Sequence, residues 1–182
     1  MAAPLPNVTH DLTLAARLRA AEPAAMSEVY AQHGPALLRA ATYLSGSLQD
    51  GEDLVQDLFV GLPEAIAKYD GTGSLAGWLR RVVVRLALMR LRTGHRRREE
   101  SGDAADHLAA GPGIDHALGD RLNIERALRA LPDGLREVFV LKELEGYRHA
   151  EIAGLLGIRV NTAQVRLHRA RLLLRQLLED HR

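Results

Sequence analysis

Residues 145–171 read EGYRHAEIAGLLGIRVNTAQVRLHRAR, and a leucine-rich segment follows them. Ile152 and Leu156 stand at helical spacing, and Gly157 follows where a left-handed residue would end a helix. After a tight turn, a second helix is predicted to begin near Asn161. Two short helices joined in this way form a helix-turn-helix, whose second helix enters the major groove of DNA. We therefore predict that this stretch reads DNA.

The second of these helices has two faces. Its apolar side chains recur at helical spacing and are predicted to face a core: Ala163, Leu167, Ala170 and Leu174. The remaining side chains are left for DNA, and glutamine suits adenine while arginine suits guanine or phosphate. These candidates are Asn161, Thr162, Gln164, Val165, Arg166, His168 and Arg169. Arg166 has an alternative role, an ion pair with Glu137 or Glu143.

Composition predicts an all-helical protein. The chain has 182 residues, of which 47% are apolar and only 4% aromatic, so its cores must consist of Leu, Ala and Val. No sustained alternation of β-branched residues indicates a sheet. The absence of cysteine excludes disulfides and thiolate metal sites, and it is compatible with a reducing cytoplasm. We also expect neither a signal peptide nor a membrane-spanning segment.

The net charge of +1 hides a strong segregation of charge. Residues 80–98 hold eight arginines and no acid, and residues 152–178 hold five arginines and no acid. Between these basic blocks, residues 99–120 hold six acids and neither Lys nor Arg. Such a pattern favours two nucleic-acid-binding segments separated by an acidic spacer.

Periodicity and breakers divide the chain into helices. The expected helices cover residues 11–18, 24–30, 36–44, 50–60, 75–98, 122–131 and 136–145, with Asp11 as the first N-cap. Breaks are expected at Pro23, at residues 34–35 and in the loop 68–74. In the helix 136–145 we expect burial of Val138, Phe139, Leu141 and Leu144. The fold class is all-α, with two small helical domains joined by a flexible acidic linker.

An acidic helix lies near the middle of the first domain. Leu54, Leu58 and Leu62 share one face, and the acids Asp50, Glu52, Asp53 and Asp57 occupy the rest. Taken alone, this is an ordinary solvated face with acids near the helix N-terminus.

Several of these stretches together resemble bacterial sigma factors. Residues 50–59, DGEDLVQDLF, resemble the acidic helix that binds core RNA polymerase, and WLRR at residues 78–81 resembles the start of the next region. The C-terminal motifs LP (131–132), REVF (136–139), EGY (145–147), EIA (151–153), LGI (156–158) and RLHRAR (166–171) resemble the sigma helix-turn-helix. The match covers roughly residues 11–178. Because no domain stands between the two halves, the resemblance is to the extracytoplasmic-function subgroup of the sigma-70 family.

This resemblance implies a role for each segment. Asp53, Gln56, Asp57 and Phe59 would bind core polymerase. The loop 69–74 and the basic helix would meet the −10 promoter element, through Trp78, Arg80, Arg81, Arg85 and Arg92. The residues already assigned to DNA, from Asn161 to Arg169, would read the −35 element. The expected domains are a tail 1–10, sigma region 2 at 11–98, a linker 99–120 near the RNA exit, sigma region 4 at 121–178 and a tail 179–182.

The implied protein is a cytoplasmic, non-enzymatic initiation factor without a cofactor. Its partners would be core polymerase and promoter DNA, with an anti-sigma protein as a further candidate. The alternative is a one-component helix-turn-helix regulator that dimerises through its N-terminal helices. An enzyme finds no support, since no nucleophile–base pair or phosphate-binding loop is present, and the scattered histidines show no metal-ligand spacing.

Some residues keep two interpretations or depart from the family. Trp78 either stacks on a base or packs in the core, and the arginine run could be a solvated face. Arg85 and Met89 stand where the family commonly has Asn and Asp, and residues 161–165 differ from the common Gly-Thr-Val-Lys-Ser. Arg148 stands where a Ser often caps the first reading helix with Glu151. The preferred promoter sequence therefore cannot be transferred from the family.

Overall fold

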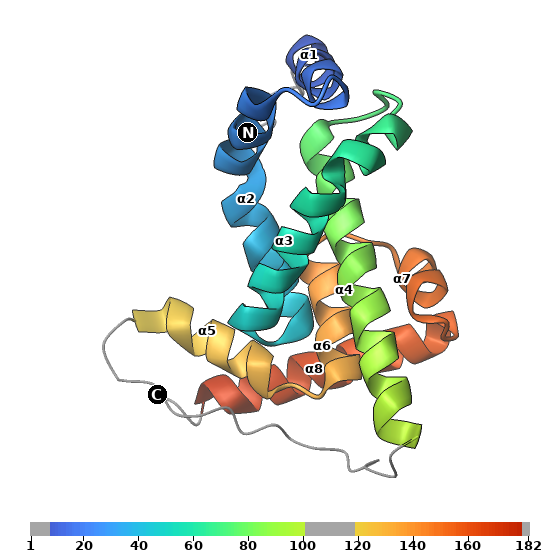
Figure 1. Cartoon of the computed structure of the whole chain (residues 1–182). Coiled ribbons are helices and arrows are strands. Elements are labelled where there is room, and N and C mark those ends of the chain that lie inside the picture. The colour runs from blue at the N-terminus through green and yellow to red at the C-terminus, as the bar shows by residue number, and fades with distance from the viewer. Residues whose placement is uncertain (1–7, 101–118, 180–182) are drawn as a thin grey trace.

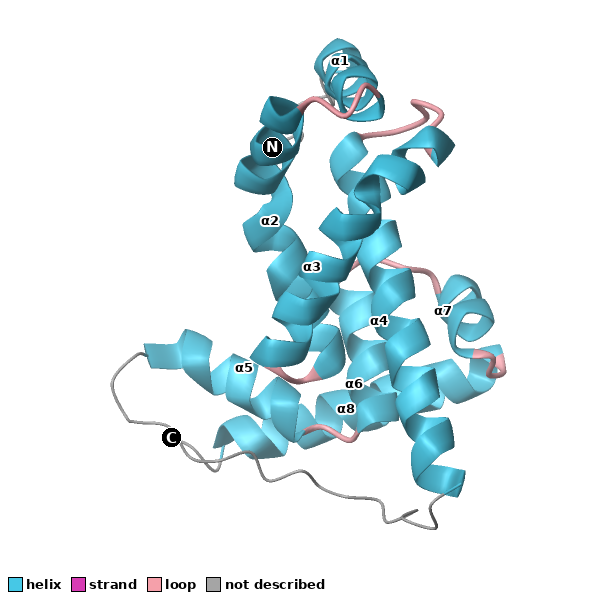
Figure 2. Ribbon diagram, in the orientation of Figure 1, coloured by secondary structure: helices cyan, strands magenta, loops and turns pink. Residues whose placement is uncertain are grey.

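The computed structural model describes residues 8–100 and 119–179, with side chains for residues 9–94 and 124–179, and every regular element there is helical. The elements are α1 Val8–Arg19, α2 Pro23–Ser45, α3 Leu48–Ala65, the 3₁₀ helix η1 Ile66–Lys68, α4 Leu75–Glu100, α5 Gly119–Ala130, α6 Asp133–Phe139, the π-helix η2 Val140–Leu144, α7 His149–Leu156 and α8 Val160–Glu179. Figure 2 shows the loops of the described residues as short pink segments between cyan helices. The all-α prediction is confirmed, whereas most of the expected linker lies outside the described residues.

The N-terminal half is an upright bundle of α2, α3 and α4, with α1 lying across its upper end (Figure 1). Leu54, Leu58 and Leu62 of α3 are buried in its core, as predicted. Gly51 allows α3 to approach α2 closely, because a Cβ at this position would stand 2.4 Å from Thr42 Oγ1. The sequence periodicity therefore identified the packed face of α3 correctly.

The helix break expected at residues 34–35 is wrong. Helix α2 runs without interruption from Pro23 to Ser45, with Pro35 inside it and exposed. Val29 and Leu37, on either side of the proline, are both buried in the same core. Their burial keeps the two segments in one helix although Pro35 has no N–H for the helical hydrogen bond.

The start expected for the first helix is also wrong. Helix α1 begins at Val8, so Asp11 lies inside it. The carboxylate of Asp11 instead accepts a hydrogen bond from the backbone N–H of Leu75, at 2.9 Å. Asp11 thus gives a hydrogen-bond acceptor to a backbone N–H at the start of α4, which has no partner within that helix. This bond, between residues 64 positions apart, attaches α1 to α4.

The C-terminal half contains α5 to α8, and the predicted helix-turn-helix is α7 and α8. Gly157 has the expected left-handed conformation, at φ 66°. Glu151 accepts a hydrogen bond from the backbone N–H of Arg148 at 2.6 Å, while the Arg148 guanidinium, which has no acceptor, cannot complete the capping box. Of the two hydrogen bonds of a capping box, only the one accepted by the Glu151 side chain is therefore present in this helix.

The helix expected at residues 136–145 divides into α6 and η2. Val138 and Leu141 are buried, but Leu144 is 43% exposed, so the prediction of its burial is wrong. In the π-helical segment each backbone hydrogen bond spans one residue more than in an α-helix, which shifts the later side chains around the helix axis. Burial of Leu144 was predicted from a period of 3.6 residues per turn, and this period does not hold in the π-helical segment.

The two halves are in contact. In Figure 1, α5 and α8 cross beneath the lower ends of α2 and α3, and α7 lies beside α4. Val138, Ile152 and Leu167 of the C-terminal half belong to the same apolar core as the N-terminal bundle. A smaller second cluster joins α5 to α8 through Leu128 and Leu174.

Candidate functional site

An apolar groove lies between α2 and α3. It has a volume of about 670 Å³, and its lining includes Phe59 and Gln56, both of which were assigned to polymerase. Tyr30 packs edge-on against Phe59, with ring centroids 5.2 Å apart and ring planes at 65°. Tyr30 is 57% exposed and Val60 is 76% exposed. The sequence analysis did not select Tyr30 or Val60. Val60 could have been found, because it is an apolar residue of α3 that lies outside the buried face formed by Leu54, Leu58 and Leu62.

The two acids assigned to the same surface lie beside the basic helix. Asp53 and Asp57 approach Arg90 of α4, with the nearest oxygen and nitrogen atoms 3.6 Å and 3.4 Å apart. All three side chains are substantially exposed, so these pairs contribute little to stability. The carboxylates therefore remain accessible to a partner, and Arg90 offsets part of their charge.

The arginines assigned to the −10 element lie along α4. Arg81, Arg85 and Arg92 recur at intervals of four and seven residues and are exposed, and so is Arg80. The opposite side of α4, represented by Leu79 and Val83, is fully buried. Since the buried and exposed sides of α4 separate in this way, the exposed side is a basic stripe suited to phosphates.

Trp78 is partly buried and packs on Tyr69, with ring centroids 5.7 Å apart and ring planes at 53°. Tyr69 itself is only 1% exposed. This contact supports the core interpretation of Trp78, although the residue as a whole is only partly buried.

The loop before α4, predicted at residues 68–74, is fixed by hydrogen bonds. The hydroxyl of Tyr69 donates to the Gly73 carbonyl at 2.9 Å, and Arg19 donates to the Tyr69 carbonyl at 2.5 Å. Asp70 Oδ1 accepts bonds from the backbone and hydroxyl of Thr72, at 2.9 and 2.6 Å, which lower the pKa of Asp70. The loop therefore has a defined shape before any ligand binds.

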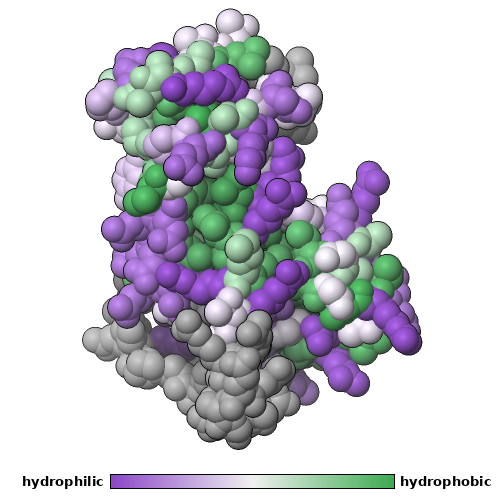
Figure 3. All heavy atoms as spheres, turned by 45° about the vertical axis from the view of Figure 1, so that its right-hand side comes forward, coloured by the Kyte–Doolittle hydropathy of each residue, from purple (hydrophilic) through white to green (hydrophobic). Residues whose placement is uncertain are grey.

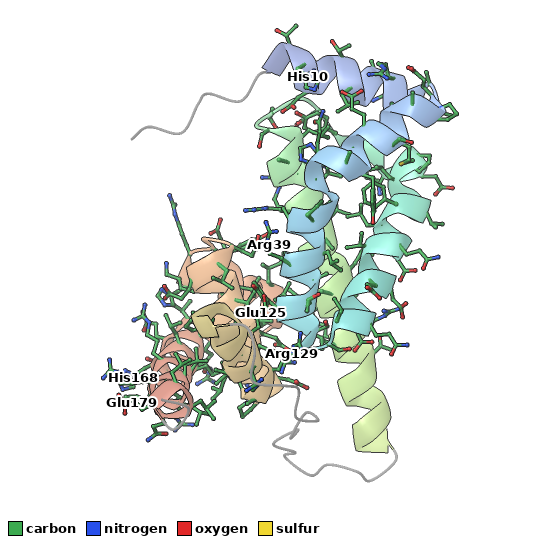
Figure 4. The ribbon with its side chains drawn as sticks, turned by 90° about the vertical axis from the view of Figure 1, so that its left-hand side faces the viewer. His10, Arg39, Glu125, Arg129, His168 and Glu179 are labelled. Atoms are coloured by element: carbon green, nitrogen blue, oxygen red, sulfur yellow. The ribbon has the colours of Figure 1, made fainter. Side chains whose placement is uncertain are left out.

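Helix α8 presents most of its predicted DNA-reading residues to solvent. Its predicted core residues are buried: Ala163, Leu167, Ala170 and Leu174. On the outer side, Asn161, Gln164, Val165, His168 and Arg169 are exposed, and Thr162 is partly buried. Figure 4 shows His168 pointing away from the rest of the molecule. These six residues share the accessible side of the helix.

Arg166 is placed differently from the other six. Its guanidinium lies against α6, where a Cβ added to Gly134 would stand 3.0 Å from Arg166 Nη1. It lines a cavity of about 410 Å³ together with Glu137 and with Arg92 of α4. Glu143, one of the two ion-pair partners considered for Arg166, pairs instead with Arg171 at 2.5 Å. The structure therefore favours an inward role for Arg166 beside Glu137.

Glu137 is a buried carboxylate, 8% exposed. Burial is the main reason that its pKa is raised to about 7, and the charge of Asp133 acts in the same direction. The nearby positive charges of Arg136, Arg166 and Arg92 oppose this increase. The group therefore changes charge near neutral pH, at the place where α4 meets the C-terminal half.

The surface over α4 and α7 combines apolar and charged areas. In Figure 3, purple hydrophilic side chains surround a green apolar area near the middle of this face. Met89, 61% exposed, is one large apolar side chain of α4 that reaches the surface. Within the part of the chain that is described, no group of histidine and acidic side chains is arranged to hold a metal ion, and no helix is long and apolar enough to cross a membrane.

Comparison with known proteins places both halves in one family. Residues 29–98 match sigma-70 region 2, and residues 121–174 match sigma-70 region 4. The sigma factor CnrH of Cupriavidus metallidurans is 32% identical over 186 residues, covering 93% of this chain and 94% of CnrH. The extracytoplasmic-function sigma factor SigE of Mycolicibacterium smegmatis is 35% identical over 159 residues, covering 85% of this chain but only 62% of SigE.

Two solved structures share the fold. The sigma factor RpoE of Bartonella quintana, solved with the anti-sigma factor NepR, aligns with a TM-score of 0.57 and 25% identity over 86% of this chain and 98% of that one. CnrH, solved with the cytosolic domain of CnrY, aligns with a TM-score of 0.52 and 28% identity over 93% and 97%. These matches favour a sigma factor over a one-component regulator. The chain belongs to the sigma-70 family of RNA polymerase sigma factors, in the extracytoplasmic-function subgroup.

Proposed function

We propose that this protein binds core RNA polymerase, directs it to specific promoters and assists opening of the duplex. One observation carries the proposal. A single chain holds sigma regions 2 and 4 in this order, and each presents an exposed surface of the matching chemistry. The protein supplies binding energy and no catalytic step, and it acts in the cytoplasm, where core polymerase is found.

The groove between α2 and α3 is the proposed docking surface for polymerase. Phe59 and Gln56 line it, and Asp53 and Asp57 lie on the same helix, where they approach Arg90 of α4. An apolar groove beside accessible carboxylates suits a helical partner that carries basic residues next to its apolar face. In this assignment the aromatic pair of Tyr30 and Phe59 forms the apolar anchor.

The basic stripe on α4 is the proposed surface for the −10 element. Arg80, Arg81 and Arg85 are exposed and would neutralise phosphates. The hydrogen-bonded loop before α4 and the partly buried Trp78 would hold an unpaired base. A loop fixed in advance loses less conformational entropy when a base binds, which favours strand separation.

The outer side of α8 is the proposed reader of the −35 element. Asn161, Thr162 and Gln164 lie in its first turn and a half, the part of a recognition helix that reaches base edges. His168 and Arg169 lie one turn further, where phosphate contacts are suited to them. Arg166 would support this surface from the inner side. An anti-sigma protein is a further proposed partner, since RpoE was solved in complex with the anti-sigma factor NepR.

In vitro transcription tests the proposal. The purified chain is added to core polymerase with genomic fragments, and transcripts with defined starts are expected. Gln164→Ala should lower transcription from such a promoter about tenfold, through loss of a base contact of about 1–3 kcal/mol. Gln176→Ala, exposed on the same helix three turns later, should leave transcription unchanged. If no defined start requires the protein, the proposal is wrong.

A further inference from the structure

Helix α1 holds both ends of the loop at residues 69–74. Arg19 donates a hydrogen bond to the carbonyl of Tyr69, the first residue of the loop, at 2.5 Å. Asp11 accepts one from the backbone N–H of Leu75, the residue that follows the loop, at 2.9 Å. Both bonds reach backbone atoms, so they fix the path of the chain itself. In Figure 1 the loop reaches the end of the bundle across which α1 lies.

The same helix also contacts the middle of the loop. A Cβ added to Gly71 would stand 2.7 Å from Cδ2 of Leu12, and Gly71 has a φ of +80°. A side chain at this position would strain the backbone and would displace Leu12. Helix α1 therefore meets the loop at its start, its middle and its end.

The three contacting residues lie on one face of α1. Asp11, Leu12 and Arg19 fall within an arc of about 100° and span about 12 Å along the helix axis. The helix is itself anchored to the bundle, since Leu14 and Leu18 are only 1% and 2% exposed. A fixed helix that contacts a loop at three points restricts the conformations that the loop can adopt.

The contacts of α1 also reach the aromatic pair and the basic helix through the loop. The ring of Tyr69 packs on Trp78, and its hydroxyl donates to the Gly73 carbonyl. A shift of the Tyr69 carbonyl, which Arg19 holds, would therefore move the ring on which Trp78 packs. Leu75 is the first residue of α4, so Asp11 fixes where that helix begins. The loop, the indole and the start of α4 are thus positioned together.

We propose that α1 is a positioning helix for base capture, in which Asp11 and Arg19 hold the loop 69–74 in the shape that accepts an unpaired base. The two side chains act through the loop backbone, without contacting DNA. This inference rests on the proposed function, because it assigns a further part of the chain to the surface proposed for the −10 element. That part lies outside residues 29–98, which match sigma-70 region 2.

Hydrogen exchange of the free protein tests whether α1 fixes the loop. Deuterium uptake is measured by mass spectrometry in peptides that contain residues 69–75. Asp11→Ala leaves the N–H of Leu75 without its acceptor and should speed uptake there about tenfold, since hydrogen bonds to charged groups are among the stronger ones. Asp11→Asn keeps an oxygen acceptor and should restore most of the protection. Equal uptake by the natural protein and Asp11→Ala would overturn the inference.

Arg19→Ala and Arg17→Ala form a matched pair, because each removes one arginine from α1. Arg17 pairs with Glu22 and Glu28, at 2.9 and 2.7 Å, and so attaches α1 to α2 rather than to the loop. Trp78 is the chain's only tryptophan, and acrylamide quenching of its fluorescence reports on this region. Arg19→Ala should increase quenching, whereas Arg17→Ala should not. Equal quenching in the two variants, with helices intact by circular dichroism, would contradict a specific role for Arg19.

Transcription from two templates separates positioning from a general loss of stability. A promoter found with the natural protein is prepared once fully paired and once with mispaired bases at the −10 element. Asp11→Ala should lower transcription from the paired template about tenfold and from the mispaired one much less, because mispaired bases cost less free energy to separate. Asp11→Asn should be close to the natural protein on both. Equal losses of Asp11→Ala on the two templates would refute the positioning role.

Glu64→Ala is the control for charge, because it also removes one negative charge, at an exposed position of α3. Loss of a negative charge by itself favours binding to phosphates. Electrostatics alone therefore predicts that neither variant loses activity, whereas positioning predicts a loss for Asp11→Ala only. Equal activity of these two variants on the paired template would overturn the inference.

Failure of the inference and failure of the proposed function give different results. If the natural protein starts no transcription with core polymerase, the proposed function is wrong, and hydrogen exchange still decides whether α1 fixes the loop. If the natural protein is active and Asp11→Ala is equally active on the paired template, the positioning role is wrong and the proposed function stands.

Discussion

Glu137 should make the stability of this protein decrease as pH rises toward neutrality. The folded state raises the pKa of this carboxyl from 4.5 to about 7, chiefly through burial, so the folded protein binds the proton more tightly than the unfolded chain. Below pH 4.5 both states are protonated and the contribution is fully present. It is lost progressively between pH 4.5 and about 7. A shift of this size corresponds to about 3 kcal/mol at pH 8, since each unit of pKa is 1.36 kcal/mol.

The variant Glu137→Gln removes this dependence, because the amide has nearly the shape of the protonated carboxyl and carries no charge. Urea unfolding, followed at 222 nm at pH 5, 6, 7 and 8, gives the free energy of unfolding of both proteins. The variant should gain about 2–3 kcal/mol relative to the natural protein between pH 5 and pH 8. Glu64→Gln, at an exposed position of α3, should show no such gain. An equal difference at all four pH values, or a natural protein that is the more stable one at pH 8, would refute the reasoning.

Two further substitutions test the contact between the halves and the docking surface. Gly46→Ala should destabilise the protein by at least about 1–2 kcal/mol in thermal unfolding, because φ is +76° and the new Cβ would stand 2.7 Å from Arg136 Cζ. Gly61→Ala, in an exposed helix position with nothing within 4 Å, should stabilise it by about 0.5–1 kcal/mol, and a loss at this site would contradict the propensity argument. Asp57→Ala should weaken core polymerase binding several-fold by titration while leaving the DNA contacts of α8 unchanged. Glu64→Ala on the same helix is its control, and equal weakening by both would refute a specific role for Asp57.

The buried faces of individual helices could be predicted from the sequence because they depend on local spacing. Leu54 and Leu58 on α3, and Ala163 and Leu167 on α8, lie inside as their periodicity indicates. The prediction failed at Leu144, where a π-helix changes the number of residues per turn. It also failed at Pro35, where burial of the flanking helix outweighs the lost hydrogen bond. Both errors come from applying a local rule where packing decides.

The contact between the N-terminal and C-terminal halves could not be predicted from the sequence. It depends on charged residues that are buried, whereas charged residues are usually exposed. Arg136 and Glu137 are charged, and sequence reasoning treated Arg136 only as part of a family motif and Glu137 as a surface ion-pair partner. Arg136 is nevertheless buried because the carbonyls that end α2 need donors, and they come from a residue 91 or more positions away in the chain. Asp11, which binds the start of α4, follows the same logic. Helix ends leave backbone groups unsatisfied, and only the tertiary fold shows which distant polar side chain meets them.

The position of Arg166 follows from that contact and narrows the choice of DNA-reading residues. Its place on α8, one residue before the buried Leu167, allows its side chain to turn toward α6 or toward DNA. The side chain of Arg166 points inward because Gly134 has no side chain to exclude it and because the carboxylate of Glu137 attracts its positive charge. This charge offsets part of the cost of burying Glu137. Under the proposed function, specificity at the −35 element would then depend mainly on Asn161 and Gln164, whose side chains are exposed in the first turn and a half of α8. Replacing Arg166 should therefore change stability more than promoter preference, whereas replacing Gln164 should do the opposite.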